Sequence, residues 1–556
     1  MSTALPLLRI RPAPNTPVQE KDEAATMPGF FHFLTLLGLH IFAHESVDVV
    51  VLEVGLGGRL DATNVVPRPV ASGITTLDYD HVAILGPTLA DIAREKAGIM
   101  RAGVPVYTIP QEATAAAALQ AAAAHMHTPL ATVDTQWLDS RLQATPSPPH
   151  SIAGGAAYQR LNASLAVALA EEFARQVPPG LGLGGQAHNA ASHARHTATV
   201  SAPDAPIAAA LCQGLAASRW PGRAHTVLAA VPGSQGAAQG VGLQVCLDGA
   251  HTAAAMLKAA EWYQQERSAA AEHSILMFNC NHGKDPLPLL APLIQMSWDG
   301  VLFAPFDFDK PTSAEVPSVL EVFENHAKLQ VEAGTMSDAD ARQLVQSCQD
   351  AVRDTLVALA HSDGAESWPE PPLSQAAAAA VHSGSGSSSG ALKDAAAAAV
   401  AAAQGSAPQY DLRWQRVLAQ VWAVLIRHPS LTEKILKPCA AGTEAQMQAA
   451  EAAAAANAAP IGATDAVVCN SIKDALACMG AMAAAAPPST PSSTAAAGGI
   501  SWEPKLGAVA VDVNAPALPS LAVAPTVRAS ALVSGSLYLV GNSLQHLGWS
   551  PDKDVP

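Results

Sequence analysis

The sequence predicts an α/β protein with mostly parallel sheets in two domains. A continuous β-branched and aliphatic run, Val49 to Leu52, is typical of a central parallel strand that is covered on both faces. A glycine-rich turn follows it at residues 55–58. Further apolar runs appear later, each followed by a helix-like or polar segment, as a smaller Rossmann-like domain requires. These runs are residues 243–247, 274–278 and 300–304.

Length and composition fit two domains with additional insertions. The chain has 556 residues, of which 49% are apolar, which is ample for two hydrophobic cores. We expect an irregular N-terminus at residues 1–26, a first domain at 27–210 and a second domain at 211–556. An amphipathic helix is predicted at residues 411–426. Low-complexity insertions, disordered or loosely helical and without assigned chemistry, are predicted at residues 178–206, 375–404, 440–459 and 481–499.

Charge, cysteine content and hydropathy narrow the class of protein. The formal net charge of -16 argues against nonspecific nucleic-acid binding, but it does not oppose an anionic substrate that local arginines and metal ions can hold. Seven cysteines without a C-x-x-C pair indicate a reducing compartment and no zinc site. The longest apolar stretch near the start, residues 30–43, is interrupted by histidines and is too short to span a bilayer. We therefore expect a large soluble enzyme.

The first candidate site lies at the end of the predicted strand, residues 47–54. Glu53 emerges there, and ligands of open α/β sheets bind at the carboxyl ends of the strands. Gly55, Gly57 and Gly58 would let the backbone approach a ligand closely. An acid beside such a turn indicates a site for a metal ion and phosphates. The alternative is a purely structural turn, because G-x-G-G is not the dinucleotide fingerprint.

The second candidate is a lysine on an apolar helix face. Thr88 is a good N-cap with Asp91 three residues later, so a helix is predicted to begin at Leu89. Lys96 falls on the same stripe of this helix as Leu89 and Ile92. Burying an ammonium group is costly unless it is paired, coordinated or modified. Lys96 therefore either extends past the core to solvent or takes part in chemistry.

The third candidate is His81. It lies on a predicted loop between a strand near residues 71–77 and the helix that begins at Leu89. An imidazole at this place is a candidate metal ligand. The alternative is a structural histidine, which is the more frequent role of a lone His.

Several blocks occur in a recognisable order along the chain. The first are E-V-G-L-G-G-R-L-D-A-T-N at 53–64, D-H at 80–81, L-G-x-T at 85–88, E-K-A-G-I at 95–99 and Y-Q-R-L-N-A at 158–163. The later ones are W-P-G-R at 220–223, L-D-G-A-H-T at 247–252, F-N at 278–279, K-D-P at 284–286, S-I-K-D-A-L at 471–476 and a predicted strand at 531–540 leading into Gly541. This order resembles folylpolyglutamate synthases, which are members of the Mur ligase superfamily. The resemblance spans Met27 to Gly548, and M-P at 27–28 with F-F-H-F-L-T at 30–35 favours the eukaryotic type. It implies a Mur-ligase-like ATPase domain and a smaller Rossmann-like domain.

The resemblance implies roles for the three candidates. Glu53 would hold a magnesium ion that bridges ATP phosphates, and His81 would hold a second magnesium ion near an acyl phosphate. Lys96 matches a lysine that is carbamylated in this superfamily, which would turn its cation into an anionic metal ligand. A monovalent cation such as K+ is a further cofactor that the resemblance suggests.

Further residues are implied to bind nucleotide or glutamate. Asn162 matches the adenine-side asparagine of the family, with Gln159 beside it, and Arg223 would contact ATP phosphate from the second domain. Asp248 and His251 match the D-G-A-H motif at the domain interface, which helps to bind nucleotide and to position the incoming glutamate. Considered alone, Asp248 also fits an ordinary turn aspartate.

The implied activity is ATP-driven amide ligation. A folate γ-carboxylate attacks the γ-phosphate of ATP, and the amine of L-glutamate then attacks the acyl phosphate. Magnesium ions and Arg223 would offset the negative charge, and two closing domains would exclude water. The implied ligands are ATP, magnesium, tetrahydrofolate with its polyglutamates, and L-glutamate. We expect a monomer in the cytoplasm, or in mitochondria or plastids if a transit peptide precedes this sequence.

The sequence departs from the family pattern in one respect. The family begins with a P-loop of the form G-T-x-G-K-G-S, but no G-x-x-G-K-[ST] occurs here, and residues 1–26 stand in its place. We expect an incomplete gene model, in which the strand at 47–54 has an unpaired edge and an exposed apolar face. The rival interpretations are a non-catalytic folate- or glutamate-binding homologue and a related ligase such as dihydrofolate synthase.

Overall fold

The computed structural model consists of two compact units, residues 1–67 and 68–556. It describes residues 28–145, 152, 155–176, 209–231, 241–306, 316–332, 334–360, 410–439, 466–469, 471–484, 511–512 and 526–549. The predicted N-terminal segment 1–26 and the predicted insertions at 178–206, 375–404 and 440–459 lie outside these residues.

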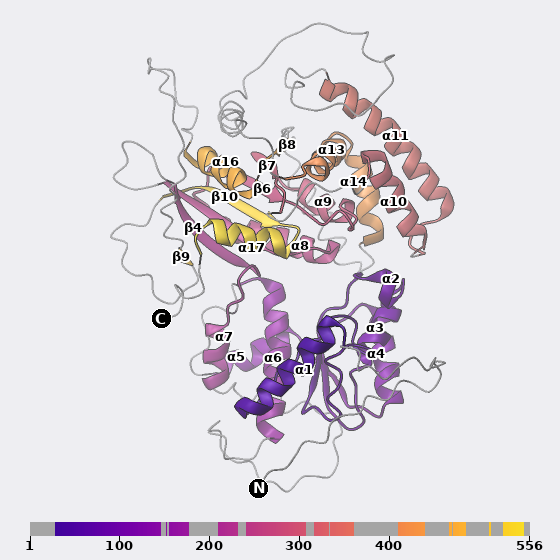
Figure 1. Ribbon diagram of the computed structural model, residues 1–556, viewed down its shortest axis with the longest axis vertical. Helices are drawn as coiled ribbons and strands as arrows, with labels where there is room; N and C mark the ends of the chain where they lie inside the picture. The colour runs from indigo at the N-terminus through magenta and orange to yellow at the C-terminus, as the bar shows by residue number, and fades with distance from the viewer. Residues whose placement is uncertain are drawn as a thin grey trace. The chain divides into compact units, whose positions relative to one another are not determined.

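In the first unit, one helix precedes an irregular chain. α1 (Phe30–Glu45), in indigo in Figure 1, ends at Ser46, which adopts a left-handed conformation with φ 54°. None of the residues of α1 is buried. The strand predicted at residues 47–54 is wrong, because this stretch is irregular and Val51 is 88% exposed. A strand needs neighbours for its backbone N–H and C=O groups, and no strand of the described residues pairs with this stretch.

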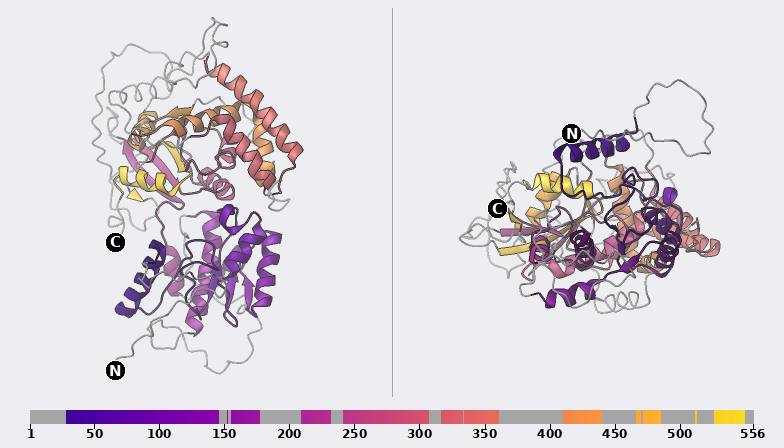
Figure 2. Two further views of the ribbon diagram at one scale, coloured as in Figure 1. Left: turned by 45° about the vertical axis from the view of Figure 1, so that its right-hand side comes forward. Right: turned by 90° about the horizontal axis from the view of Figure 1, so that it is seen from below.

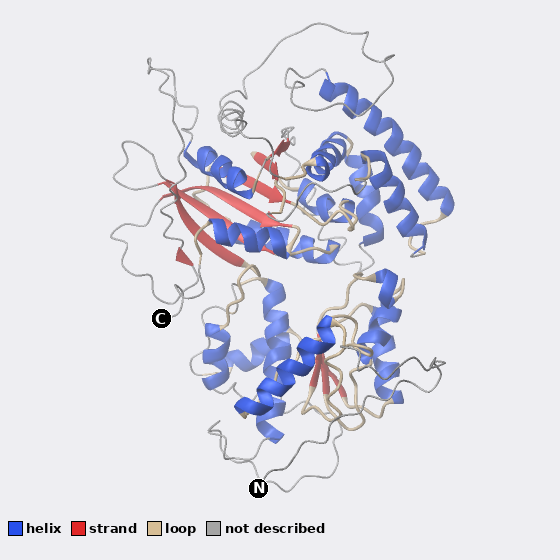
Figure 3. Cartoon of the chain, viewed as in Figure 1, coloured by secondary structure: helices blue, strands red, loops and turns tan. Residues whose placement is uncertain are grey.

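The central part of the second unit, residues 68–217, is built on a three-stranded parallel sheet (Figure 3). The strands lie in the order β1 (Ser72–Ile74), β2 (Val106–Thr108) and β3 (Leu130–Thr132). The helices are α2 (Val82–Leu85), α3 (Leu89–Ala97), α4 (Ala113–His125), α5 (Thr135–Gln143), α6 (Ala157–Gln176) and α7 (Ala209–Ala217). β1 confirms the strand predicted near residues 71–77, although it is shorter.

Helices cover both faces of this small sheet. On one face Ile74 of β1 and Ile92 of α3 belong to one core cluster, which also includes residues of α4. On the other face Tyr107 of β2 packs with Leu165 of α6. Figure 1 shows the same arrangement, with α3 and α4 on one side of the strands and α6 on the other. The carboxyl ends of the strands therefore stay open to the segments that follow them.

The helix that carries Lys96 begins where the sequence predicts. The Thr88 side chain accepts a hydrogen bond from the Asp91 backbone N–H, and the Asp91 carboxylate accepts one from the Thr88 N–H. This capping box stabilises the start of α3 by about 1 kcal/mol. Leu89 and Ile92 are buried, as their shared stripe predicts.

The C-terminal part of the second unit, residues 220–549, is built on a seven-stranded sheet. Its order is β8 (Ala466–Val468), β7 (Gly300–Phe303), β6 (His273–Phe278), β10 (Thr526–Ser534), β5 (Val241–Asp248), β4 (His225–Val231) and β9 (Val511–Asp512). The strands from β8 to β5 are parallel, whereas β4 runs antiparallel to β5 and β9. β5, β6 and β7 confirm the predicted strands at 243–247, 274–278 and 300–304. The predicted α/β class with mostly parallel sheets is confirmed.

Helices also cover both faces of the larger sheet (Figure 2). One core cluster joins the sheet to α8 (Ala253–Glu266), α9 (Leu287–Ile294), α10 (Val319–Glu332), α11 (Asp338–Ala360), α13 (Arg413–Arg427) and α14 (Pro429–Cys439). A second cluster joins its other face to α16 (Ile472–Ala484) and α17 (Leu537–His546). α13 confirms the amphipathic helix predicted at 411–426, and its Trp422 is among the largest fully buried side chains.

Two predictions near the C-terminus need correction. The strand predicted at 531–540 ends at Ser534, because Gly535 adopts φ 109° and Ser536 caps the new helix α17 by accepting from the Tyr538 N–H. A side chain at position 535 would also collide with the carbonyl oxygen of Asn279. The tract predicted at 481–499 begins inside α16, which ends at Ala484, and the rest of it lies outside the described residues.

Candidate functional site at the carboxyl ends of β5 and β6

Polar residues that follow β1 contact the turns that follow β5 and β6. Asp78 accepts a hydrogen bond from the Thr252 hydroxyl at 2.6 Å, and Asp80 accepts one from Lys284 Nζ at 3.3 Å. Lys284 Nζ also donates to the carbonyl oxygen of His251 at 3.3 Å. Ligands of open α/β sheets bind at the carboxyl ends of parallel strands, so these contacts mark a candidate site.

Asp80 is surrounded by basic side chains. Its carboxylate lies 3.3 Å from Lys284 Nζ and 3.6 Å from the Nε2 atoms of both His81 and His251. We call Asp80 with these basic residues the Asp80 cluster. Burial opposes ionisation of Asp80, but the hydrogen bond from His251 and the charge of Lys284 outweigh it and hold the pKa of this carboxyl well below its usual range. The cluster therefore carries several donors for anionic groups around one internal counter-ion.

Lys96 lies near the Asp80 cluster on α3. Its side chain is half-buried, and burial lowers the pKa of its ammonium group while the negative charge of Asp80 opposes that shift. The predicted stripe thus places a half-buried lysine near the Asp80 cluster.

The three predicted metal ligands belong to different units, Glu53 to the first and His81 and Lys96 to the second. His81 caps α2 with φ 54° and its side chain is half-exposed, while Glu53 is exposed in the unit of residues 28–67. Among the described residues, no three His, Cys, Asp or Glu side chains gather in a group that could hold a metal ion. Glu53 and His81 remain predicted magnesium ligands.

The glycine-rich turn is organised by an aspartate to which the sequence analysis gave no role. Asp61 accepts from the Leu56 N–H at 2.9 Å, and from the Thr63 N–H at 2.9 Å and hydroxyl at 2.6 Å. Gly57 adopts φ 69°, and a side chain at Gly55 would lie 2.7 Å from Phe31. Two of the glycines thus have local structural reasons, and the D-x-T spacing of an Asx turn is the signal that could have identified Asp61.

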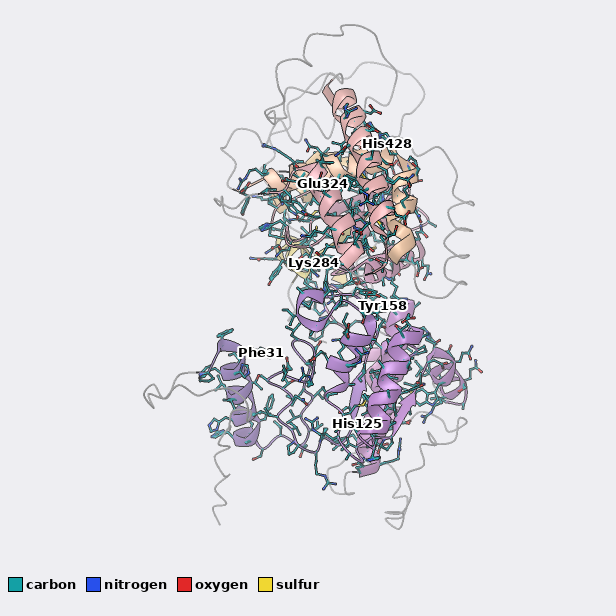
Figure 4. The ribbon with its side chains drawn as sticks, turned by 90° about the vertical axis from the view of Figure 1, so that its right-hand side faces the viewer. Phe31, His125, Tyr158, Lys284, Glu324 and His428 are labelled. Atoms are coloured by element: carbon teal, nitrogen blue, oxygen red, sulfur yellow. The ribbon has the colours of Figure 1, made fainter. Side chains whose placement is uncertain are left out.

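Helix α6 carries the predicted adenine-side residues. Asn162 Nδ2 donates to Gln159 Oε1 at 3.3 Å, so the two predicted residues are in contact. The sequence analysis gave no role to their neighbour Tyr158, although it stands in the quoted Y-Q-R-L-N-A block. Its hydroxyl donates to Asp248 Oδ2 at 2.5 Å and connects α6 to the end of β5. Figure 4 labels Tyr158 and Lys284 where the central and C-terminal parts approach each other.

Asp248 organises two turns of the C-terminal part. Besides Tyr158, the backbone N–H groups of Ala224 and Ala250 donate to its carboxylate, each at 2.9 Å. Asp248 is only 4% exposed, and burial raises the pKa of its carboxyl while these hydrogen bonds and the charge of Arg223 oppose the shift. These contacts match the turn-aspartate alternative. Nucleotide contact by Asp248 stays a prediction.

Arg223 and His251 belong to the two turns whose backbone N–H groups donate to this carboxylate. A side chain at Gly249 would collide with Arg223 Nη1 and with Leu537, so the glycine of the D-G-A-H motif makes room for the guanidinium. His251 Nδ1 is bonded to the Gly249 carbonyl oxygen at 2.8 Å, which directs Nε2 toward Asp80. The structure therefore brings His81, His251 and Lys284 together at Asp80, and Arg223 beside Asp248.

Comparisons with known proteins agree with the motif order. Folylpolyglutamate synthase of Bos taurus mitochondria is 34% identical over 300 residues, and the match covers 52% of this chain and 47% of that protein. The Homo sapiens mitochondrial enzyme gives the same values, and an Arabidopsis thaliana enzyme is 33% identical over 304 residues, covering 49% of this chain and 45% of that protein. This chain is similar to folylpolyglutamate synthases over about half of its length. The predicted resemblance is confirmed, and the chain spans about half the length of these curated relatives.

Two further comparisons concern the C-terminal part and the fold. Residues 236–353 match a family model described as dihydrofolate synthetase, C-terminal domain. E. coli FolC in complex with DHPP and ADP aligns with a TM-score of 0.36 and 23% identity over 57% of this chain and 64% of that one. The apo form of L. casei FPGS aligns with a TM-score of 0.34 and 23% identity over 51% of this chain and 61% of that one.

None of the helices in the described residues combines the length and apolar character that a membrane crossing needs.

Proposed function

We propose that this chain takes part in the ATP-dependent addition of L-glutamate to the γ-carboxylate of tetrahydrofolate and its polyglutamates. The observation that carries the proposal is the identity of 34% with folylpolyglutamate synthases over 300 residues. The Asp80 cluster supports it, because ligation through an acyl phosphate brings several anionic groups to one place, where basic side chains stabilise them.

The proposed reaction has two steps. A γ-carboxylate oxygen of the folate attacks the γ-phosphorus of ATP, and ADP leaves as the acyl phosphate forms. The neutral amine of L-glutamate then attacks the acyl carbon, inorganic phosphate leaves, and the amine proton passes to solvent. Lys284 and His251 would lie beside the developing negative charge, while closure of the two domains over the site would exclude the water that could hydrolyse the acyl phosphate.

The remaining site residues take the roles that the resemblance implies. Asn162 and Gln159 would hold the adenine side of ATP, and Arg223 would contact its phosphates. His251 would stand on the glutamate side, and Asp248 would organise the nucleotide turn. Carbamylated Lys96, with Glu53 and His81, would form the magnesium ligand set, which would neutralise phosphate charge when the ions are bound. The protein would act as a monomer in the cytoplasm, or in mitochondria or plastids.

The direct test is ADP release by the purified chain. We expect ADP to form only when ATP, magnesium, tetrahydrofolate and L-glutamate are all present, and mass spectrometry should show a folate that is one glutamyl residue heavier. Omission of either acceptor or amino acid provides the control. Binding of folate without any ADP release would instead support a non-catalytic binding homologue.

A dihydrofolate synthase activity is the second candidate. It is favoured by the match of residues 236–353 to the model described as dihydrofolate synthetase, C-terminal domain. The two activities share ATP and L-glutamate and differ in the acceptor. ADP release with dihydropteroate in place of tetrahydrofolate would establish this candidate. Turnover with tetrahydrofolate but none with dihydropteroate would reject it.

A further inference from the structure

We propose that Tyr158 and Asp248 form a positioning pair, which sets the spacing between the adenine-side helix α6 and the phosphate-side turn that carries Arg223. This inference rests on the proposed function, because it concerns the geometry of the proposed nucleotide site. It assigns Tyr158 a role in nucleotide binding, although Tyr158 itself does not touch the ligand.

The bond between Tyr158 and Asp248 joins the central and C-terminal parts. Tyr158 stands near the start of α6 in the central part, whereas Asp248 ends β5 in the larger sheet. The neighbouring Ala156 is fully buried in the core cluster of the C-terminal part, and Tyr158 packs against the same cluster. Apolar packing therefore already holds the start of α6 against the C-terminal part, and the Tyr158 hydroxyl adds a hydrogen bond of 2.5 Å to Asp248.

The Asp248 carboxylate also fixes the turn beside it. It accepts from the Ala224 N–H, next to Arg223, and from the Ala250 N–H, next to His251. Losing any of these donors would cost free energy, because a buried charge without hydrogen-bond partners is unfavourable. The Asp248 side chain thus fixes the relative positions of the Arg223 turn, the His251 turn and the start of α6.

Helix α6 also carries the predicted adenine-side residues. Asn162 follows Tyr158 by one helical turn on the same face, so the two side chains are about 6 Å apart along the helix axis. Asn162 is in contact with Gln159. Fixing Tyr158 to Asp248 therefore fixes the predicted adenine-side pair relative to Arg223. Burial and the charge of Asp248 both raise the pKa of Tyr158, so its hydroxyl stays protonated and remains a donor.

The chain offers a matched control for this bond. Tyr107 is buried, whereas Tyr158 is partly buried, and the Tyr107 hydroxyl donates to Glu172 Oε2 at 2.8 Å. Both of these residues belong to the central part, so this bond has the same chemistry but does not join the two parts. Removing either hydroxyl removes one hydrogen bond to a carboxylate. Only Tyr158→Phe changes the position of α6 relative to the turn that carries Arg223.

The experiment compares Tyr158→Phe with Tyr107→Phe in the full chain. We expect both variants to unfold at a lower temperature than the parent. Tyr158→Phe should raise the KM for ATP and the Kd of a nonhydrolysable ATP analogue about tenfold, the size of one lost charged hydrogen bond, with kcat changed less than about twofold. Tyr107→Phe should leave both ATP constants within about twofold of the parent. Asp248→Asn, which weakens the acceptor, should reproduce the rise as a second variant.

The outcomes separate this inference from the proposed function. If the parent binds the analogue and both Phe variants bind it equally well, the positioning role is wrong while the ligase proposal stands. An equal loss of ATP affinity in both variants would show a general effect of stability and would also overturn the inference. A parent chain that binds no ATP analogue would overturn the proposed function and the inference together.

Discussion

Two apolar stretches of similar composition have different fates in this molecule. Residues 47–54, VDVVVLEV, stay irregular, and Val51 is 88% exposed. Residues 241–248, VGLQVCLD, form β5, where Val245 is fully buried and pairs with Val227 of β4 and Ala531 of β10. The difference lies in the neighbours, since β5 has a strand on each side and the first stretch has none among the described residues.

The comparison shows what an apolar run encodes. β-branched residues favour extended backbone, but the ladder that makes a strand is completed by residues far away in the chain. β5 pairs with residues 225–231, which precede it closely in the chain, and with residues 526–534, which follow it by hundreds of positions.

The largest expected effect is a charge placed in each stretch. Val245→Asp buries a carboxylate inside the sheet and should lower the free energy of unfolding by about 4 kcal/mol or more, enough to prevent folding. Val51→Asp should change it by less than about 0.5 kcal/mol, because that side chain already faces solvent. Denaturant titration of the two variants provides the measurement. A large loss for Val51→Asp would mean that residues 47–54 are covered in solution.

The second prediction concerns the effect of two α3 side chains on ligation activity. Lys96→Ala should lower kcat for ligation by about a thousandfold, equivalent to about 4 kcal/mol, while the fold persists. Arg94→Ala, on the same helix but exposed, provides the control and should keep nearly full activity. Steady-state ADP release and circular dichroism measure the two effects. Near-normal turnover of Lys96→Ala would reject its proposed role.

The third prediction compares ion pairs with and without burial. Arg141 is 3% exposed, donates from Nη1 to Glu171 at 2.6 Å and lies over the Trp137 ring. Arg141→Ala leaves the carboxylate of Glu171 without its buried partner and should cost about 3 kcal/mol of stability. The exposed pair of Arg353 and Asp350 is the control, and Arg353→Ala should have no measurable effect. Equal effects in thermal unfolding would contradict the argument.

The smallest effect is expected in the glycine-rich turn. Asp61→Ala should lower the hydrogen-exchange protection of the Leu56 and Thr63 amides about fivefold, the size of one lost hydrogen bond. Burial raises the pKa of Asp61, but bonds from Thr63 and Leu56 outweigh it and lower the pKa below 3.8. The stabilisation is therefore complete above about pH 4 and is lost as the pH falls through the folded-state pKa. Protection that is the same in both proteins at about pH 6 would sink this account of the turn.

Much of the fold could be predicted from local sequence. The cap at Thr88 fixed the start of α3, and the apolar runs at β5, β6 and β7 lie between partners that complete them. The errors arose where a distant contact decided the outcome. The predicted strand at 531–540 stops because Gly535 must approach Asn279, and no local pattern reveals that approach. The stretch at 47–54 has the propensity of a strand but no partner in the described residues.

The candidate site was predicted in part for the same reason. His81, His251 and Lys96 were found because their blocks are continuous in the chain. Asp80 and Lys284 stand inside quoted blocks, yet their contact spans more than two hundred positions and only the fold brings them together. Tyr158 gave no signal, because a tyrosine at the start of a helix does not show which carboxylate it will reach.

The central claim, ligation through an acyl phosphate, is tested most directly by oxygen transfer. Tetrahydrofolate labelled with oxygen-18 in its γ-carboxylate would be incubated with the chain, ATP, magnesium and L-glutamate, and the released phosphate would be analysed by mass spectrometry. The account predicts one labelled oxygen in each phosphate released, because the acyl phosphate transfers a carboxylate oxygen to phosphorus. Unlabelled phosphate formed together with a glutamylated product would contradict it.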